Sequence, residues 1–142
     1  MIWIGIDPGT HTGLAVWDGD GRRFMLVATV PLWQALQEVA SYTQQYGTSA
    51  VSVVFEDARQ RKWLPREASA SEYRGKLMGA GSVKRDSAIW QEFLEDNGIP
   101  YFHVGPRKGL TKWSPDAFAR STGWKGRTSE HSRDAALLVW GK

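Results

Sequence analysis

The chain has 142 residues, 42% of them hydrophobic, with three histidines, no cysteine and a formal charge of +3. This length and apolar content predict one globular domain that spans residues 1–142. No apolar stretch approaches roughly 18 residues and no basic segment precedes an apolar one, so we expect a cytoplasmic protein with no membrane span or secretory signal. The absence of cysteine excludes disulfides and thiolate zinc sites, so a bound metal would be held mainly by oxygen.

Charge is distributed unevenly along the chain. Residues 1–56 contain two basic and five acidic side chains, whereas residues 57–133 contain 15 basic and nine acidic ones. The positive excess of the second part fits a surface that meets phosphates, and a solvated basic face is the simpler alternative.

The chain begins with three runs of apolar and β-branched residues, each closed by turn residues. They predict three antiparallel strands, at residues 2–6, 12–17 and 23–30. The turn after the first run is Asp7-Pro8-Gly9-Thr10, which places Asp7 at the C-terminal end of a strand. From this segment alone, a functional carboxylate and a turn aspartate that binds its own backbone are equally good interpretations.

A predicted helix and a buried strand follow. Apolar residues at helical spacing over 32–46, with Gly47 behind them, predict the helix, and the continuous apolar run 50–55 predicts the strand. A helical crossover lays this strand parallel to its neighbours in the sheet, which brings Glu56 beside Asp7. Asp57 competes with Glu56 for the same role.

A basic loop comes next, in which Arg59, Arg61 and Lys62 precede Trp63. Such cations grip a phosphate backbone, and an aromatic ring beside them stacks on an unpaired base. Packing of Trp63 against the core is the alternative, because most of the eight tryptophans must be core residues.

The remaining pattern predicts a helix over 72–97, a strand over 99–104, and helices over 115–122 and 130–140. Three glycines in the first half of the 72–97 segment indicate either that the helix begins nearer Ser82 or that something approaches its backbone closely. Nucleic acid is one candidate for this close approach, and packing of the helix against the sheet is the simpler one. Lys108 lies in a second basic loop, and Ser114 and Ser129 are expected to cap the last two helices.

The last helix carries His131 and Asp134 three residues apart, so both lie on one face. Glu130 could reach the same side, although an acidic residue at a helix start is often only a partner of the helix dipole. Carboxylates gathered against their own repulsion usually hold a divalent cation, so the leading interpretation is a metal-dependent nuclease.

The order of elements, together with the segments Ile4-Gly5-Ile6-Asp7-Pro8-Gly9, Val53-Val54-Phe55-Glu56 and His131-Ser132-Arg133-Asp134-Ala135-Ala136, resembles the RuvC-type Holliday junction resolvases of the RNase H-like superfamily. In length the chain is similar to the compact versions carried by bacteriophages. The resemblance implies an α/β RNase H-like fold, with a five-stranded mixed sheet of three antiparallel strands followed by parallel strands, flanked by helices.

The resemblance also implies an activity: cleavage of branched DNA, above all four-way junctions, by a homodimer that uses two Mg²⁺ or Mn²⁺ ions in each active site. The implied catalytic and metal-binding residues are Asp7, Glu56, His131 and Asp134. The residues expected to bind DNA are Arg59, Arg61, Lys62, Trp63, Lys108 and Lys112.

Three other functions stay open at this point. One is an RNase H-like nuclease that prefers flaps, forks or RNA/DNA hybrids. Another is a nucleotide-binding domain, because the segment from Asp7 to Gly13 is also similar to the phosphate-binding hairpin of the actin and Hsp70 ATPases, which need two such domains. The third is a nucleic-acid-binding module without catalysis, which the intact acidic set disfavours.

Overall fold

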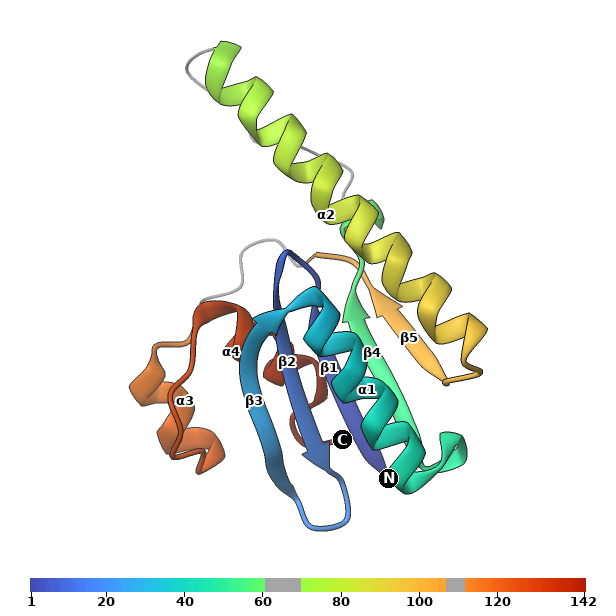
Figure 1. Cartoon of the computed structure of the whole chain (residues 1–142). Helices are drawn as coiled ribbons and strands as arrows, with labels where there is room; N and C mark the ends of the chain where they lie inside the picture. The colour runs from blue at the N-terminus through green and yellow to red at the C-terminus, as the bar shows by residue number, and fades with distance from the viewer. Residues whose placement is uncertain (61–69, 107–111) are drawn as a thin grey trace.

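A computed structural model describes residues 1–60, 70–106 and 112–142. Its centre is a five-stranded sheet in the order β3-β2-β1-β4-β5, with helices on both faces (Figure 1). The fold class predicted from the sequence is confirmed, since three antiparallel strands are followed by parallel ones as in RNase H-like folds.

The helices and strands agree with the predicted ones to within about two residues at most ends. The strands are β1 (Ile2–Asp7), β2 (His11–Asp18), β3 (Arg23–Pro31), β4 (Val51–Glu56) and β5 (Tyr101–Val104). The helices are α1 (Leu32–Tyr46), α2 (Ala70–Asp96), α3 (Pro115–Thr122) and α4 (Glu130–Val139), and short 3-10 turns lie at Thr48–Ala50 and Ala58–Gln60.

The pairing of β1 with β4 determines which residues meet at the edge of the sheet. These strands are parallel, with Ile6 opposite Phe55, so Asp7 and Glu56 follow at the same level on neighbouring strands. Neighbouring strands lie about 5 Å apart. The crossover through α1 therefore brings together two carboxylates that are 49 positions apart in the sequence.

Each face of the sheet has its own apolar core. Ile6 and Phe55 belong to the core beneath α1 and α2, together with Trp90 of α2. Val54 points to the other face, where the core includes Ala135 of α4. Figure 1 shows α1 and α2 on the near side of the sheet and α4 behind it. Because side chains alternate along a strand, Asp7 and Glu56 belong to the α4 face.

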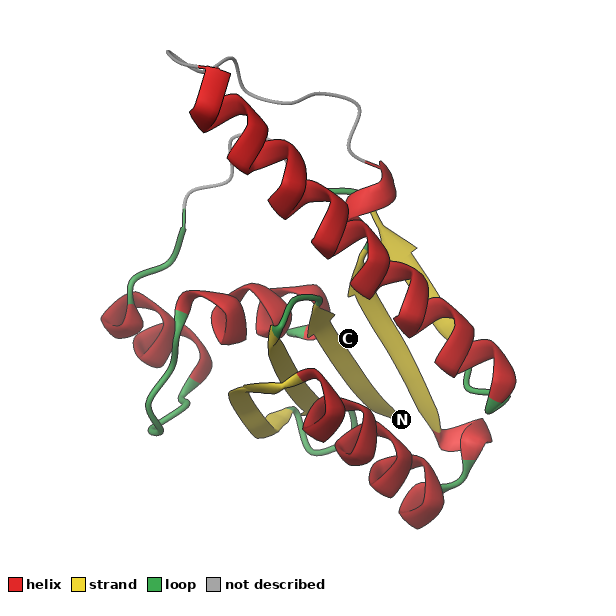
Figure 2. Ribbon diagram, turned by 45° about the horizontal axis from the view of Figure 1, so that its top comes forward, coloured by secondary structure: helices red, strands yellow, loops and turns green. Residues whose placement is uncertain are grey.

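Helix α2 is a single helix of 27 residues, about 40 Å long at 1.5 Å per residue. Its C-terminal half packs on the sheet, and its N-terminal half extends beyond the strand ends that carry Asp7 and Glu56 (Figures 1 and 2). The alternative start near Ser82 is wrong, because the helix begins at Ala70. Within the described part of the chain, a Cβ placed on Gly79 or Gly81 would meet no atom within 4 Å.

No helix in the described parts of the chain is long and apolar enough to cross a bilayer.

Candidate active site

Two glycines allow α4 to lie directly on the sheet. A Cβ on Gly5 would collide with the carbonyl of Ala135, and a Cβ on Gly13 would collide with the carbonyl of His131. Hydrogen is the only side chain that fits at either position, so the backbone of α4 approaches β1 and β2 closely. This contact puts the first turn of α4 over the end of β1, beside Asp7.

The N-terminus of α4 is fixed by a reciprocal cap. The Ser129 hydroxyl accepts a hydrogen bond from the backbone N–H of Ser132, and the backbone N–H of Ser129 donates to the Ser132 hydroxyl at 2.9 Å. The Ser129 hydroxyl also contacts the hydroxyl of Thr29 on β3. Ser132 thus completes the capping box, which leaves Glu130 available for another contact.

Asp7 and His131 form the first pair of the site. His131 Nδ1 lies 2.9 Å from Asp7 Oδ2, and the Asp7 side chain is 15% exposed. Burial raises the pKa of Asp7, and the nearby negative charge of Asp134 adds to the rise, while His131 and Lys112 oppose it. With Nδ1 directed at the carboxylate, Nε2 is the ring nitrogen left to contact a metal or water.

Asp134 is paired with a lysine that follows the second basic loop. The Lys112 ammonium contacts Asp134 Oδ2 and lies 3.2 Å from Glu130 Oε1. Burial alone would lower the pKa of Lys112, but hydrogen bonds and charge from Asp134 and Glu130 outweigh it, and the pKa is raised. Lys112 therefore carries a full positive charge beside Asp134 and Glu130.

The backbone beside Lys112 is held by residues to which the sequence analysis gave no role. Arg133 Nε donates to the carbonyl of Trp113 at 2.8 Å, and Arg133 Nη1 donates to Thr128 Oγ1 at 2.9 Å. The Trp113 ring packs edge-on against Trp140. The only sequence signal was the position of Arg133 next to Asp134, which predicts no partner.

Glu56 and Asp57, which were rivals from the sequence, lie on opposite sides of the sheet. Asp57 is 2% exposed and accepts a two-point ion pair from Arg59, with Nε at 2.8 Å and Nη2 at 2.7 Å. His103 Nδ1 lies 3.0 Å from Asp57 Oδ2, and His103 pairs with Phe55 on the face covered by α2. The register therefore favours Glu56 over Asp57 as the partner of Asp7.

Asp57 is a structural carboxylate that stabilises the end of β4. Hydrogen bonds from Arg59 lower the pKa of Asp57 to about 2, and those from His103 assist, against the opposite effect of burial. A carboxylate whose pKa is lower in the folded state than in the unfolded state stabilises the fold above the unfolded pKa of 3.8. This stabilisation is lost as the pH falls from about 4 to about 2.

Asp57→Asn should therefore lower the free energy of unfolding at pH 7 by about 2 kcal/mol, since it removes the charge that Arg59 binds. Urea unfolding at pH 7 and near pH 2.5 measures the effect, and the difference from wild type should shrink at the lower pH. Asp20→Asn is the control, because Asp20 is 91% exposed in its ion pair and should contribute less than about 1 kcal/mol. Equal effects of the two substitutions at pH 7 would contradict the structural role of Asp57.

The residues predicted to bind DNA fall into three groups. Arg59 is engaged by Asp57 and by Gln91, so a phosphate would have to compete with a buried carboxylate for its guanidinium. Lys112 is paired with Asp134 and Glu130. The others fall outside the described residues: Arg61, Lys62, Trp63 and Lys108.

The types of donor at this edge suit a hard divalent cation, because three carboxylates and an imidazole are the ligands that Mg²⁺ or Mn²⁺ accepts. Asp134 and Glu130 already bind one cation, the Lys112 ammonium. In the described ranges, however, no three His, Asp or Glu side chains are gathered closely enough to form a ready metal site. Asp7 and Asp134 are instead turned toward His131 and Lys112.

A scan against protein-family models gave no match to this chain, and a search of curated proteins gave none either. The sheet order, the pairing directions and the flanking helices define an α/β protein whose topology is consistent with that of RNase H-like proteins.

Proposed function

We propose that this protein is a divalent-metal-dependent endodeoxyribonuclease that cleaves branched DNA, with the four-way junction as its main substrate. The observation that supports the proposal is that three separate elements, β1, β4 and α4, each carry a carboxylate toward the same edge of the sheet. Asp7 ends β1, Glu56 ends β4, and Asp134 lies on α4, which is seated over Gly5 and Gly13. Like charges brought close together repel, and two-metal hydrolysis of a phosphodiester uses such a set of oxygen ligands.

In the proposed reaction, each of these residues has one task. When bound, a pair of Mg²⁺ or Mn²⁺ ions supplies an activated water and stabilises the leaving 3′ oxygen. Asp7, Glu56 and Asp134 would provide the oxygen ligands, and the contact of Asp7 with His131 would orient the ring so that its second nitrogen could bind a cation or orient water. Lys112 places a positive charge where the phosphate would enter.

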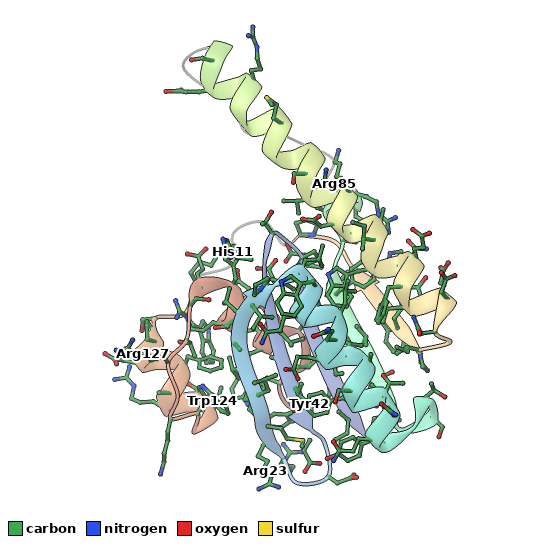
Figure 3. All side chains as sticks on the ribbon, in the orientation of Figure 1. His11, Arg23, Tyr42, Arg85, Trp124 and Arg127 are labelled. Atoms are coloured by element: carbon green, nitrogen blue, oxygen red, sulfur yellow. The ribbon has the colours of Figure 1, made fainter. Side chains whose placement is uncertain are left out.

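The surroundings of the site support a nucleic acid substrate. The projecting half of α2 lies on the side of the sheet where β1 and β4 end, and the exposed cations of this helix include Arg74, Lys84 and Arg85. Figure 3 shows Arg85 on α2 and His11, at the start of β2, both at this end of the molecule. A DNA backbone that reached Asp7 would therefore pass close to positive charge on α2.

The selectivity for four-way junctions and the homodimer both come from the resemblance to RuvC-type resolvases. A four-way junction has two equivalent strands to cut, and a two-fold dimer would present one active site to each of them. Light scattering of the protein alone and bound to a junction tests this expectation, and a monomer in both conditions would contradict it.

The function is tested by a Mg²⁺-dependent cleavage assay on equal concentrations of end-labelled substrates. These are four-way junctions, flaps, forks, RNA/DNA hybrids and linear duplex. We expect paired cuts in the junction strands, and no cuts in EDTA. Efficient cleavage of flaps, forks or hybrids with sparing of junctions would replace junction resolution by another RNase H-like nuclease activity.

Two results would remove the nuclease proposal. One is the absence of cleavage of every substrate at millimolar Mg²⁺ and Mn²⁺ by folded protein. The other is tight, metal-dependent binding of ATP by the isolated chain, which would favour the nucleotide-binding function.

A further inference from the structure

Lys112 holds an unusual place for a residue that would contact DNA. Its ammonium contacts Asp134 and lies within 3.2 Å of Glu130, so it joins two carboxylates one helical turn apart on α4. Lys112 and Asp134 lie close enough to Asp7 for the charge of each to act on the pKa of Asp7. One of these two carboxylates, Asp134, belongs to the proposed metal site.

The backbone next to Lys112 is held in place by other contacts, so the Lys112 side chain reaches Asp134 from a fixed main-chain position. Arg133 holds the carbonyl of Trp113, the next residue after Lys112, and the Trp113 ring packs against Phe118 and Trp140. Arg133 itself lies next to Asp134 in the sequence. The same helix thus supplies the carboxylate that Lys112 binds and the guanidinium that positions the backbone beside it.

Lys112 contacts Oδ2 of Asp134, and a divalent cation bound by this carboxylate would compete with the ammonium for that oxygen and repel its charge. The lysine side chain has four rotatable methylene groups, and 58% of it is exposed. Release from Asp134 therefore requires a change of side-chain rotamer, with the backbone left in place. An ammonium freed at this edge would lie next to the position of the substrate phosphate.

We propose that Lys112 is an internal counter-cation that exchanges with the divalent metal: it neutralises Asp134 in the metal-free protein, and metal binding releases it to the DNA backbone. The inference rests on the proposed function, because it assumes that Asp134 binds metal. The exchange makes metal and DNA binding cooperative. A metal ion on Asp134 releases Lys112 to bind DNA, and DNA that binds Lys112 leaves Asp134 open to a metal ion. Lys112 acts here as a positioning and charge-switching residue.

The first experiment measures Mn²⁺ binding to the DNA-free protein by calorimetry, with Lys112→Met, Lys112→Arg and Lys125→Met as variants. Coupling between linked sites is typically about fivefold or more. We therefore expect Lys112→Met to bind Mn²⁺ at least about fivefold more tightly than wild type. Lys112→Arg keeps the charge and should bind as wild type does, and so should Lys125→Met, which removes an exposed lysine from the loop before α4.

The second experiment measures the binding of a four-way junction with and without Ca²⁺, which occupies oxygen sites while slowing cleavage. Wild type should gain at least about fivefold in junction affinity when Ca²⁺ is added. Lys112→Met should lose most of this gain and should differ little from wild type in EDTA. An equal loss of affinity with and without Ca²⁺ would mean that Lys112 contacts DNA whatever the metal does, and would overturn the exchange.

The outcomes separate this inference from the function on which it rests. Equal Mn²⁺ affinity of wild type and Lys112→Met, with Mg²⁺-dependent cleavage by wild type, overturns the exchange and leaves the nuclease intact. Mn²⁺ binding by Lys112→Met alone supports the exchange in its strongest form. No Mn²⁺ binding by either folded protein overturns both the metal site and the exchange.

Discussion

Asp7→Asn is expected to reduce Mg²⁺-dependent cleavage by about a hundredfold or more, because it removes the carboxylate at the centre of the site while keeping its volume. The asparagine oxygen can still accept the hydrogen bond from His131, so the local structure should persist. Single-turnover cleavage of a labelled four-way junction measures the change. Asp96→Asn, at the exposed end of α2, is the matched control and should cleave as wild type does.

The same substitution should make the metal-free protein more stable at neutral pH. Burial raises the pKa of Asp7 above its usual value, so the charged form opposes folding at every pH above the folded pKa. Asparagine removes that charge, and the gain should disappear below about pH 3.8, where both proteins are neutral at this position. Urea unfolding at pH 7 and pH 3 tests whether Asp7→Asn is the more stable protein at the higher pH only.

Normal cleavage by Asp7→Asn would exclude Asp7 from the metal site.

Gly13→Ala is expected to lower the free energy of unfolding by about 1–3 kcal/mol and to abolish most of the cleavage. Its Cβ would collide with the His131 carbonyl and would lie 3.1 Å from the Asp7 Cβ. Backbone atoms cannot rotate away, so the first turn of α4 must lift from the sheet. His131 and Asp134 would then move away from Asp7.

Gly79→Ala is the matched control for this glycine. A Cβ there meets no atom within 4 Å in the described structure, and the residue lies inside a helix. Alanine should therefore raise helix stability by about 0.5–1 kcal/mol. Thermal unfolding and junction cleavage of both variants give the comparison. Wild-type stability for Gly13→Ala would mean that α4 is seated less closely than the structure has it.

The elements themselves could be predicted because local signals agree with one another. Apolar runs closed by turn residues define β1 to β3, and Ser114 with Pro115 defines the start of α3. The parallel placement of β4 followed from the helix that precedes it, which is why Glu56 could be placed next to Asp7. Each of these predictions starts from a signal within one short segment of the sequence.

The partners of long side chains could not be predicted, because they depend on tertiary contacts. Arg59 looked like a phosphate ligand in a basic loop, yet it binds Asp57 two residues away and Gln91 on α2. Lys112 reaches Asp134 across 22 positions of sequence. The roles of Gly5 and Gly13 were equally hidden, since a strand glycine gives no indication of which helix will pack on it.

The two halves of α2 should differ in amide hydrogen exchange. Trp90 and Leu94 anchor the C-terminal half in the core, so its amides should exchange only when the whole domain unfolds. In the N-terminal half of α2, every described side chain before Ser82 is exposed. A helix this short is marginally stable in water when nothing packs against it. These amides should exchange through local opening. A ligand that binds this half of α2 must also order it, and the ordering costs part of the binding free energy. Such a ligand should therefore slow the exchange of these amides while binding more weakly than its contacts alone would allow.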